Sequence, residues 1–237
     1  HALGYRDSGM MGTEANQRPE AFWNVDLEAA TERVVRIIRE ARPSVLISYD
    51  PNGNYGHPDH INAYRIARAA FEASGDPARY PSAGVPHTVA KRYEIAFSRE
   101  HWFAVMREMV ERGIPLPWDF SADEVVSREA DALNPSNVEA MRQIEEDLAA
   151  GEEPPETFGT PEARITTRVD VAAFLGRKRA CMDCHRTQRQ DMGWVLDLPA
   201  DLADRVLSPE RFVLVDWRGR EGSVPDGYRE ESLFAGL

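Results

Sequence analysis

The chain has 237 residues, of which 42% are hydrophobic and 29% are charged. This length and balance fit one large or two small globular domains, and the absence of an apolar run of about eighteen residues excludes a membrane-spanning helix. The 28 basic and 40 acidic side chains give a formal charge of −12. Such a charge repels a phosphate backbone, so we expect no nucleic-acid partner and no membrane partner.

The cysteines and the first residues bear on where the protein works. Cys181 and Cys184 lie three positions apart and cannot build a disulfide framework, which favours a reducing compartment. The chain begins at His1 without the charged and apolar regions of a secretory signal peptide. We therefore expect a cytoplasmic protein whose natural start was removed by processing or truncation.

Helix and strand patterns alternate in the first hundred residues. Asp26 is a candidate N-cap for an amphipathic helix over residues 26–41, and the apolar run 45–49 predicts a strand buried on both faces of a parallel sheet. A second helix is predicted over 61–74 and a weaker strand over 93–97. The alternation predicts an α/β fold, with a parallel sheet flanked by helices.

The pattern changes at residue 99. A helix over 99–112 is followed by a proline-containing turn and an acidic, helix-prone stretch, and we interpret residues 99–160 as an inserted helical cap. The elements predicted beyond it are a strand over 166–169, a long helix over 171–188, a last strand over 212–215 and a glycine-rich tail over 217–237. We expect residues 1–237 to form a single domain.

The segment 49–60, with the sequence YDPNGNYGHPDH, carries the strongest chemical signal. It leaves the carboxyl end of a predicted strand, where ligands bind in open α/β sheets. Pro58 suits the first turn of a helix, so His60 is expected near a helix N-terminus and His57 in the loop. Neutral imidazole suits zinc, and Asp59 can orient a ring. In the alternative interpretation, Asp59 only caps the helix and both histidines are surface residues, since they do not complete a catalytic zinc site.

The HPDH sequence, preceded by YDPNGNYG, resembles the second signature of the PIG-L/LmbE superfamily of zinc-dependent N-deacetylases. The resemblance is greatest to its mycothiol-pathway branch of deacetylases and S-conjugate amidases. Further similar segments follow the same order along the chain: LGYRDSGM at 3–10, ITTRVD at 165–170, Lys178 through HRTQ at 185–188, and LFAG at 233–236. The resemblance implies a Rossmann-like fold and hydrolysis of an N-acyl bond on a small amino sugar of the N-acetylglucosamine type.

The resemblance also implies roles for single residues. His60 is implied to be a zinc ligand. His57 is implied to donate a proton or hydrogen bond to the tetrahedral intermediate, with Asp59 holding its ring, and Tyr55 to help stabilise the oxyanion. The residues implied to line the substrate pocket are Asp7 and Met10. Without the resemblance, Asp7 would be interpreted as a turn residue beside Ser8 and Gly9.

One signature of the superfamily does not occur in this chain. It is an upstream His-Pro-Asp-Asp-Glu motif, whose histidine and second aspartate complete the zinc site and whose first aspartate acts as the general base. We therefore expect the chain to lack the first βα units of the domain, to supply one metal ligand of three, and by itself to have little zinc affinity. Imidazole and carboxylate ligands accept ferrous iron as well as zinc, so both metals are candidates.

Two other functions fit the same scaffold. One is a mycothiol S-conjugate amidase, which would act on a thiol conjugate, and the other is a non-catalytic sugar-binding protein. A third possibility comes from residues 181–185, CMDCH, which match the attachment pattern of c-type haem. They lie inside a predicted helix, so we expect a structural segment in which both thiols are buried.

Aromatic residues and isolated histidines complete the set of candidates. We interpret the apolar side chains of the middle segment as packing in the core or cap, with a substrate wall as the alternative; they are Trp102, Phe103, Met106, Trp118 and Phe120. A wall of this kind would favour a substrate with an apolar portion. His87 and His101 stand alone in the sequence, and we interpret both as non-catalytic.

Overall fold

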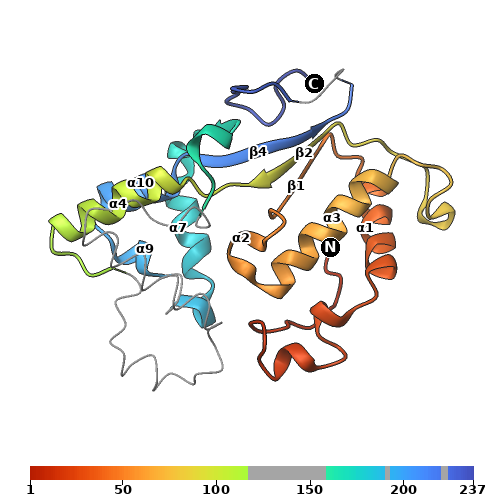
Figure 1. The fold of residues 1–237 in the computed structure, drawn as a ribbon, viewed down its shortest axis with the longest axis horizontal. Coiled ribbons are helices and arrows are strands. Elements are labelled where there is room, and N and C mark those ends of the chain that lie inside the picture. The colour runs from red at the N-terminus through yellow and green to blue at the C-terminus, as the bar shows by residue number, and fades with distance from the viewer. Residues whose placement is uncertain (117–158, 190–192, 220–223) are drawn as a thin grey trace.

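The computed structural model describes residues 1–116, 159–189, 193–219 and 224–237. Its helices are α1 Leu27–Ala41, α2 Gly53–Gly56, α3 Pro58–Ala73, α4 Arg99–Glu111, α7 Leu175–Asp183, α9 Trp194–Asp197 and α10 Ala200–Leu207. Its strands are β1 Val45–Ser48, β2 Lys91–Ile95, β3 Thr167–Val169 and β4 Glu210–Trp217. Figure 1 shows α1 and α3 beside the sheet, and α4, α7, α9 and α10 gathered beyond the end of β2. None of the described helices is long and apolar enough to cross a membrane.

The described strands form one sheet with the order β1-β2-β4-β3. β1 and β2 are parallel, with Ser48 opposite Glu94, whereas β4 is antiparallel to both β2 and β3. The predicted Rossmann-like α/β class is confirmed, but the described sheet is mixed. The reason is the short connection between α10 and β4: the chain re-enters the sheet where β2 ends, with Phe212 opposite Ile95, and must run back along it.

The first predicted helix and strand are found close to their expected bounds. The Asp26 carboxylate accepts hydrogen bonds from the backbone N–H groups of Glu28 and Ala29, which confirms it as the N-cap of α1. The expectation that the strand after this helix is buried on both faces is wrong, because Ile47 is 41% exposed. β1 lies at the end of the described strand order and has only β2 beside it.

The long helix predicted over 171–188 is divided into α7 and two flanking 3-10 turns, Ala172–Phe174 and Arg186–Gln188. None of the residues of α7 is buried, and both Cys181 and Cys184 are exposed. The expectation of buried thiols is therefore wrong. Four of the nine residues of α7 are charged and its apolar residues do not gather on one side, so the helix has no apolar stripe that packing against the core would cover.

Two packed regions flank the faces of the sheet, and a third lies beyond the end of β2. β2 alternates between the two faces: Arg92 points to α3, where its guanidinium lies 5.9 Å from the Tyr64 ring centroid, and Tyr93 points to the C-terminal segment 224–237. In the third region, beyond the end of β2, apolar side chains of α4 and α10 pack together; they include Trp102, Phe103, Met106 and Leu202. This confirms the core-packing interpretation of α4.

Part of the predicted cap lies outside the described residues. Of the expected range 99–160, the structure describes α4, the turn that follows it and the last two residues. Trp118 and Phe120 are not among them. α10, which was not predicted, completes the apolar contact of α4, and its buried residues Leu202, Ala203 and Leu207 follow helical spacing.

Candidate active site at the end of strand β1

The loop from β1 into α3 is held by two close contacts. The Asp50 carboxylate accepts a hydrogen bond of 2.7 Å from the backbone N–H of Asn54. Gly53 has a φ of +61°, and a Cβ added there would lie 2.7 Å from the Cβ of His60 and 2.8 Å from the backbone nitrogen of Ile61. Only glycine fits this backbone conformation and this approach to α3.

His57 caps the N-terminus of α3. Its Nδ1 accepts a hydrogen bond of 3.2 Å from the backbone N–H of Asp59, and Pro58 occupies the first turn as predicted. The interpretation in which Asp59 provides the cap is wrong, because the capping side chain is that of His57. Since Nδ1 accepts this bond, the proton of the neutral ring lies on Nε2, which becomes a hydrogen-bond donor.

The ring of His60 is held in the opposite tautomer from that of His57. Its Nδ1 lies 3.2 Å from the Gly53 carbonyl oxygen, which can only accept, so Nδ1 carries the proton and Nε2 offers a lone pair. The ring stacks on Tyr49 with centroids 4.0 Å apart. Burial lowers the pKa of His60, which favours the neutral form that binds metals.

Tyr55 lies beside both imidazoles. Its ring meets those of His60 and His57 edge-on, with centroid distances of 5.1 Å and 6.1 Å, and the residue is 49% exposed. Burial and the nearby Tyr49 and Asp7 raise the pKa of its hydroxyl, so it keeps its proton and can donate a hydrogen bond. Tyr55 is thus placed beside the two rings and is partly exposed to solvent.

The N-terminal segment reaches this loop through Ser8. Its backbone N–H donates to Oδ2 of Asp59 at 3.1 Å, and its buried hydroxyl accepts from the backbone N–H of Trp23 at 2.7 Å. The neighbouring Asp7 thereby comes close to the loop: one ligand atom each of Asp7, His57 and Asp59 lies within 4.8 Å of the others. Residues about fifty positions apart in the chain converge on one point.

The three converging residues can hold a metal ion. Carboxylate oxygens and imidazole nitrogen are ligands that zinc and iron accept. In addition, Oδ1 of Asp59 is buried without a hydrogen-bond partner among the described residues, which leaves a lone pair for a cation or proton. His60 lies next to this set, with its ring centroid 4.8 Å from that of His57, but is not part of it.

Other sequence candidates lie at different places. Met10 is half-buried in a turn closed by a hydrogen bond of 3.1 Å from the Thr13 N–H to its carbonyl, outside the converging set. The ring of His87 bonds the Pro43 carbonyl and that of His101 the Arg205 carbonyl, each at 2.8 Å.

Sequence reasoning missed Ser8 and Tyr49 as parts of the site. The contact of Ser8 with Asp59 spans 51 positions and leaves no local pattern. The stacking of Tyr49 on His60 had a weak signal, since both belong to the segment 49–60.

The fold and this geometry define a class: an α/β protein with an imidazole–carboxylate site, able to bind a metal, at the carboxyl end of a parallel strand. The family model of PIG-L, described as GlcNAc-PI de-N-acetylase, matches residues 1–71. A relative from Geodermatophilus obscurus, a 1D-myo-inositol 2-acetamido-2-deoxy-alpha-D-glucopyranoside deacetylase, is 40% identical over 98% of this chain and 68% of its own length. The chain belongs to the PIG-L family.

Two relatives from Frankia carry the same deacetylase name, each with the suffix 2. That of Frankia alni is 36% identical over 98% of this chain and 70% of its own length. That of Frankia casuarinae is 38% identical over 98% of this chain and 65% of its own length. The chain thus spans about two thirds of the length of these curated relatives.

Proposed function

We propose that the protein is a metal-dependent hydrolase that removes the acetyl group from an amino sugar conjugate of the N-acetylglucosamine type. The observation that carries the proposal is that the rings of His57, His60 and Tyr55 lie together at the carboxyl end of β1, with the carboxylates of Asp7 and Asp59 beside them. The deacetylase names of relatives that are 36–40% identical give the reaction and the substrate class.

We propose zinc as the metal, with ferrous iron as the alternative, and Nε2 of His60 as its ligand. A histidine that ligates a metal usually donates its other N–H to a carbonyl or carboxylate, and the contact of His60 with Gly53 supports this role. Of the neighbouring donor atoms, Oδ2 of Asp59 already accepts from the Ser8 N–H and Nδ1 of His57 from the Asp59 N–H, which leaves Oδ1 of Asp59 next to the ion. Bound there, the ion would supply Lewis-acid polarisation of the amide carbonyl and a more acidic water.

The other residues of the site have separate tasks in this proposal. Nε2–H of His57 and the hydroxyl of Tyr55 donate hydrogen bonds to the oxygen that becomes negative as the amide is attacked. Asp59 holds the N-terminal segment against the loop through Ser8. Asp7, exposed at the rim, accepts hydrogen bonds from sugar hydroxyls, and Met10 contacts the sugar farther along the same segment.

We further propose that the whole protein carries an additional segment with the remaining metal ligands and the general base. The donor set supports this, because a catalytic zinc site takes about three protein ligands and His60 provides one. A carboxylate in that segment would take the proton from the attacking water. We do not assign this task to the exposed Asp7, because in this proposal Asp7 binds the sugar.

The test compares His57→Ala with His60→Ala in the full natural protein. We expect His57→Ala to retain its metal and to lose turnover by about 10²- to 10⁴-fold, because it removes a hydrogen-bond donor to the developing charge. His60→Ala should lose the metal itself. Metal content is measured by elemental analysis of the dialysed protein, and turnover by release of acetate from the acetamido sugar.

A matched control is His87→Ala, which removes an imidazole bonded to the Pro43 carbonyl and should keep both metal and turnover. Equal loss of metal in the His57 and His60 variants would contradict the proposed division of tasks. Absence of acetate release from the metal-loaded wild-type protein would contradict the deacetylase proposal as a whole.

A further inference from the structure

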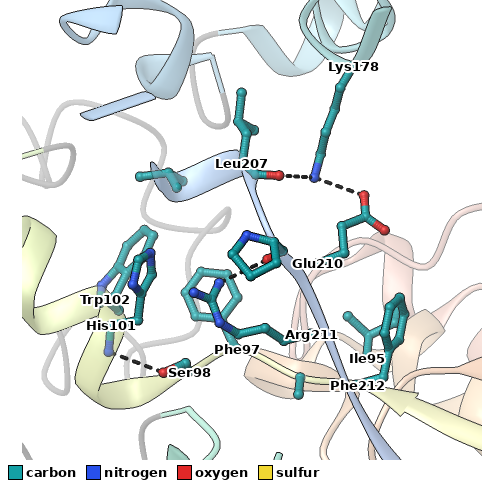
Figure 2. A pocket seen from close by; sticks show the side chains of 13 residues that line it. Ile95, Phe97, Ser98, His101, Trp102, Lys178, Leu207, Glu210, Arg211 and Phe212 are labelled. Atoms are coloured by element: carbon teal, nitrogen blue, oxygen red, sulfur yellow. Dashed lines mark hydrogen bonds and ion pairs between the residues drawn. The ribbon is translucent and has the colours of Figure 1, made fainter. Parts of the chain in front are cut away.

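A hollow lies where β2 ends and β4 begins. It is a cavity of about 270 Å³ between these strand ends, α4 and the end of α10 (Figure 2). Ligand pockets typically measure about 300–1,000 Å³, and this cavity lies just below that range, so only a small molecule would fit. Its apolar wall includes the aromatic rings of Phe97, Trp102 and Phe212.

Most charges at this cavity are compensated. Nζ of Lys178 lies 2.9 Å from a carboxylate oxygen of Glu210 and donates to the Leu207 carbonyl at 2.8 Å (Figure 2). The nearby Glu162 is bound by Arg168. These two pairs leave no net charge.

Arg211 is the exception. Its side chain extends from β4 into the region bounded by His101 and Phe97 (Figure 2). One of its terminal nitrogens donates to the Pro209 carbonyl at 3.0 Å, whereas its Nε is buried without a hydrogen-bond partner in the described part of the chain. In the register of β3 and β4 its neighbour is Arg168, which is a like charge.

Within the described residues the guanidinium of Arg211 makes no ion pair of its own, and it shares the attraction of Glu162 with Arg168, which binds that carboxylate directly. Burial lowers the pKa of Arg211, as expected for a cation held away from water. A buried charge without a partner is unfavourable for folding, and an anion that binds beside it would remove the penalty. The planar fork of a guanidinium matches the two oxygens of a carboxylate.

We propose that this cavity binds a small monocarboxylate with an aromatic or planar apolar body. The carboxylate would pair with Arg211, and the body would lie against Phe97, Trp102 and Phe212. A single charge is favoured because Arg168 and Arg211 share the one carboxylate of Glu162, which leaves one positive charge among these described residues. None of the residues that line this cavity belongs to the converging set at the end of β1.

The test measures the binding of 3-phenylpropionate to the full natural protein by titration calorimetry. We expect the acid to bind at least tenfold more tightly than its neutral isostere, 3-phenylpropionamide, because hydrogen bonds to a charged partner are stronger than neutral ones. Arg211→Met should remove this preference by weakening binding of the acid at least tenfold while leaving the amide unchanged. Arg36→Met, which changes an exposed arginine on α1, is the matched control and should bind like the wild type.

A second variant keeps the test decisive if Arg211→Met does not fold. Val206 lines the cavity, and Val206→Phe should fill it and weaken binding of both the acid and the amide. Equal affinities of the wild type for acid and amide, unchanged binding by Arg211→Met, or no saturable binding of either compound would overturn the proposal. Because binding is measured with and without metal and without turnover, failure here is distinguishable from failure of the deacetylase proposal.

Discussion

Gly53 and His60 meet in a contact that fixes how the imidazole is presented. The Gly53 carbonyl lies 3.2 Å from Nδ1 of His60, so the glycine selects the tautomer that leaves Nε2 unprotonated. The missing side chain of Gly53 allows the loop to come this close to α3. One residue therefore determines both the position of the ring and its chemical form.

A single methyl group tests this contact. Gly53→Ala should lower the free energy of unfolding by about 3 kcal/mol, because the new Cβ overlaps His60 while the backbone remains at positive φ. The matched control in the same loop is Gly56→Ala, where φ is +87° but no atom lies within 4 Å of a Cβ. Its loss should be only about 1 kcal/mol, from backbone strain. Urea unfolding measures both, and equal losses would show that the close approach is unimportant.

At the level of elements, α1 is joined to the end of α3 by one buried side chain. Arg39 is 4% exposed, and the five N–H groups of its guanidinium serve six backbone carbonyls, so that two carbonyls share one hydrogen; the carbonyls belong to Ala73, Ser74, Asp76, Arg79, Tyr80 and Gly84. The carbonyls lie at the end of α3 and in the loop before β2. Arg39 thus supplies the hydrogen bonds that water would otherwise make to the carbonyls of a stretch of chain without regular backbone pairing.

Two arginines on α1 allow a matched comparison. Arg39→Met should lower the free energy of unfolding by about 3 kcal/mol, because several buried carbonyls lose their donor. Arg36→Met removes an exposed ion pair with Glu32 one turn away and should change stability by less than about 0.5 kcal/mol. Thermal and urea unfolding of the two variants give the difference. A similar small effect for both would mean that water satisfies these carbonyls.

The elements that the sequence predicts well carry their signals within their own residues. α1 has its capping Asp26 and a regular apolar face, and the histidines of the site lie within a dozen residues of each other. The direction of β4 could not be predicted, because it depends on where α10 ends relative to β2. The contacts of Ser8 and Arg39 join distant segments through backbone groups, which leave no pattern in a single sequence.

The C-terminal segment 224–237 covers one face of the sheet and is held there by Glu230. Nζ of the buried Lys91 donates to its carboxylate at 2.9 Å and to the Ala235 carbonyl at 2.6 Å. The hydroxyls of Tyr93, Thr167 and Tyr228 also donate to Glu230. One carboxylate therefore connects β2, β3 and the end of the chain.

Glu230 and its hydrogen-bond donors should make the stability of the protein depend on pH. Burial alone would raise the pKa of Glu230, but the hydrogen bonds from Tyr93 and Lys91 outweigh it and hold this pKa below its ordinary value. The unfolded chain therefore binds the proton more readily than the folded one. The stability that ionised Glu230 contributes is thus fully present above the ordinary pKa of glutamate, and it is lost as the pH falls through the lowered pKa of the folded state.

Replacing the Glu230 carboxylate separates its contribution to the pH dependence of stability from the contributions of the other acidic groups. At about pH 7, Glu230→Gln should lose about 3 kcal/mol of unfolding free energy, because Lys91 stays buried without a counter-ion. On acidification to about pH 3 it should lose less further stability than the wild type, since the titrating group is gone. Glu72→Gln, at an exposed ion pair with Arg68, should keep the wild-type pH dependence. Urea unfolding across this range measures the slopes, and parallel curves for wild type and Glu230→Gln would show that Glu230 does not hold the C-terminal segment through its charge.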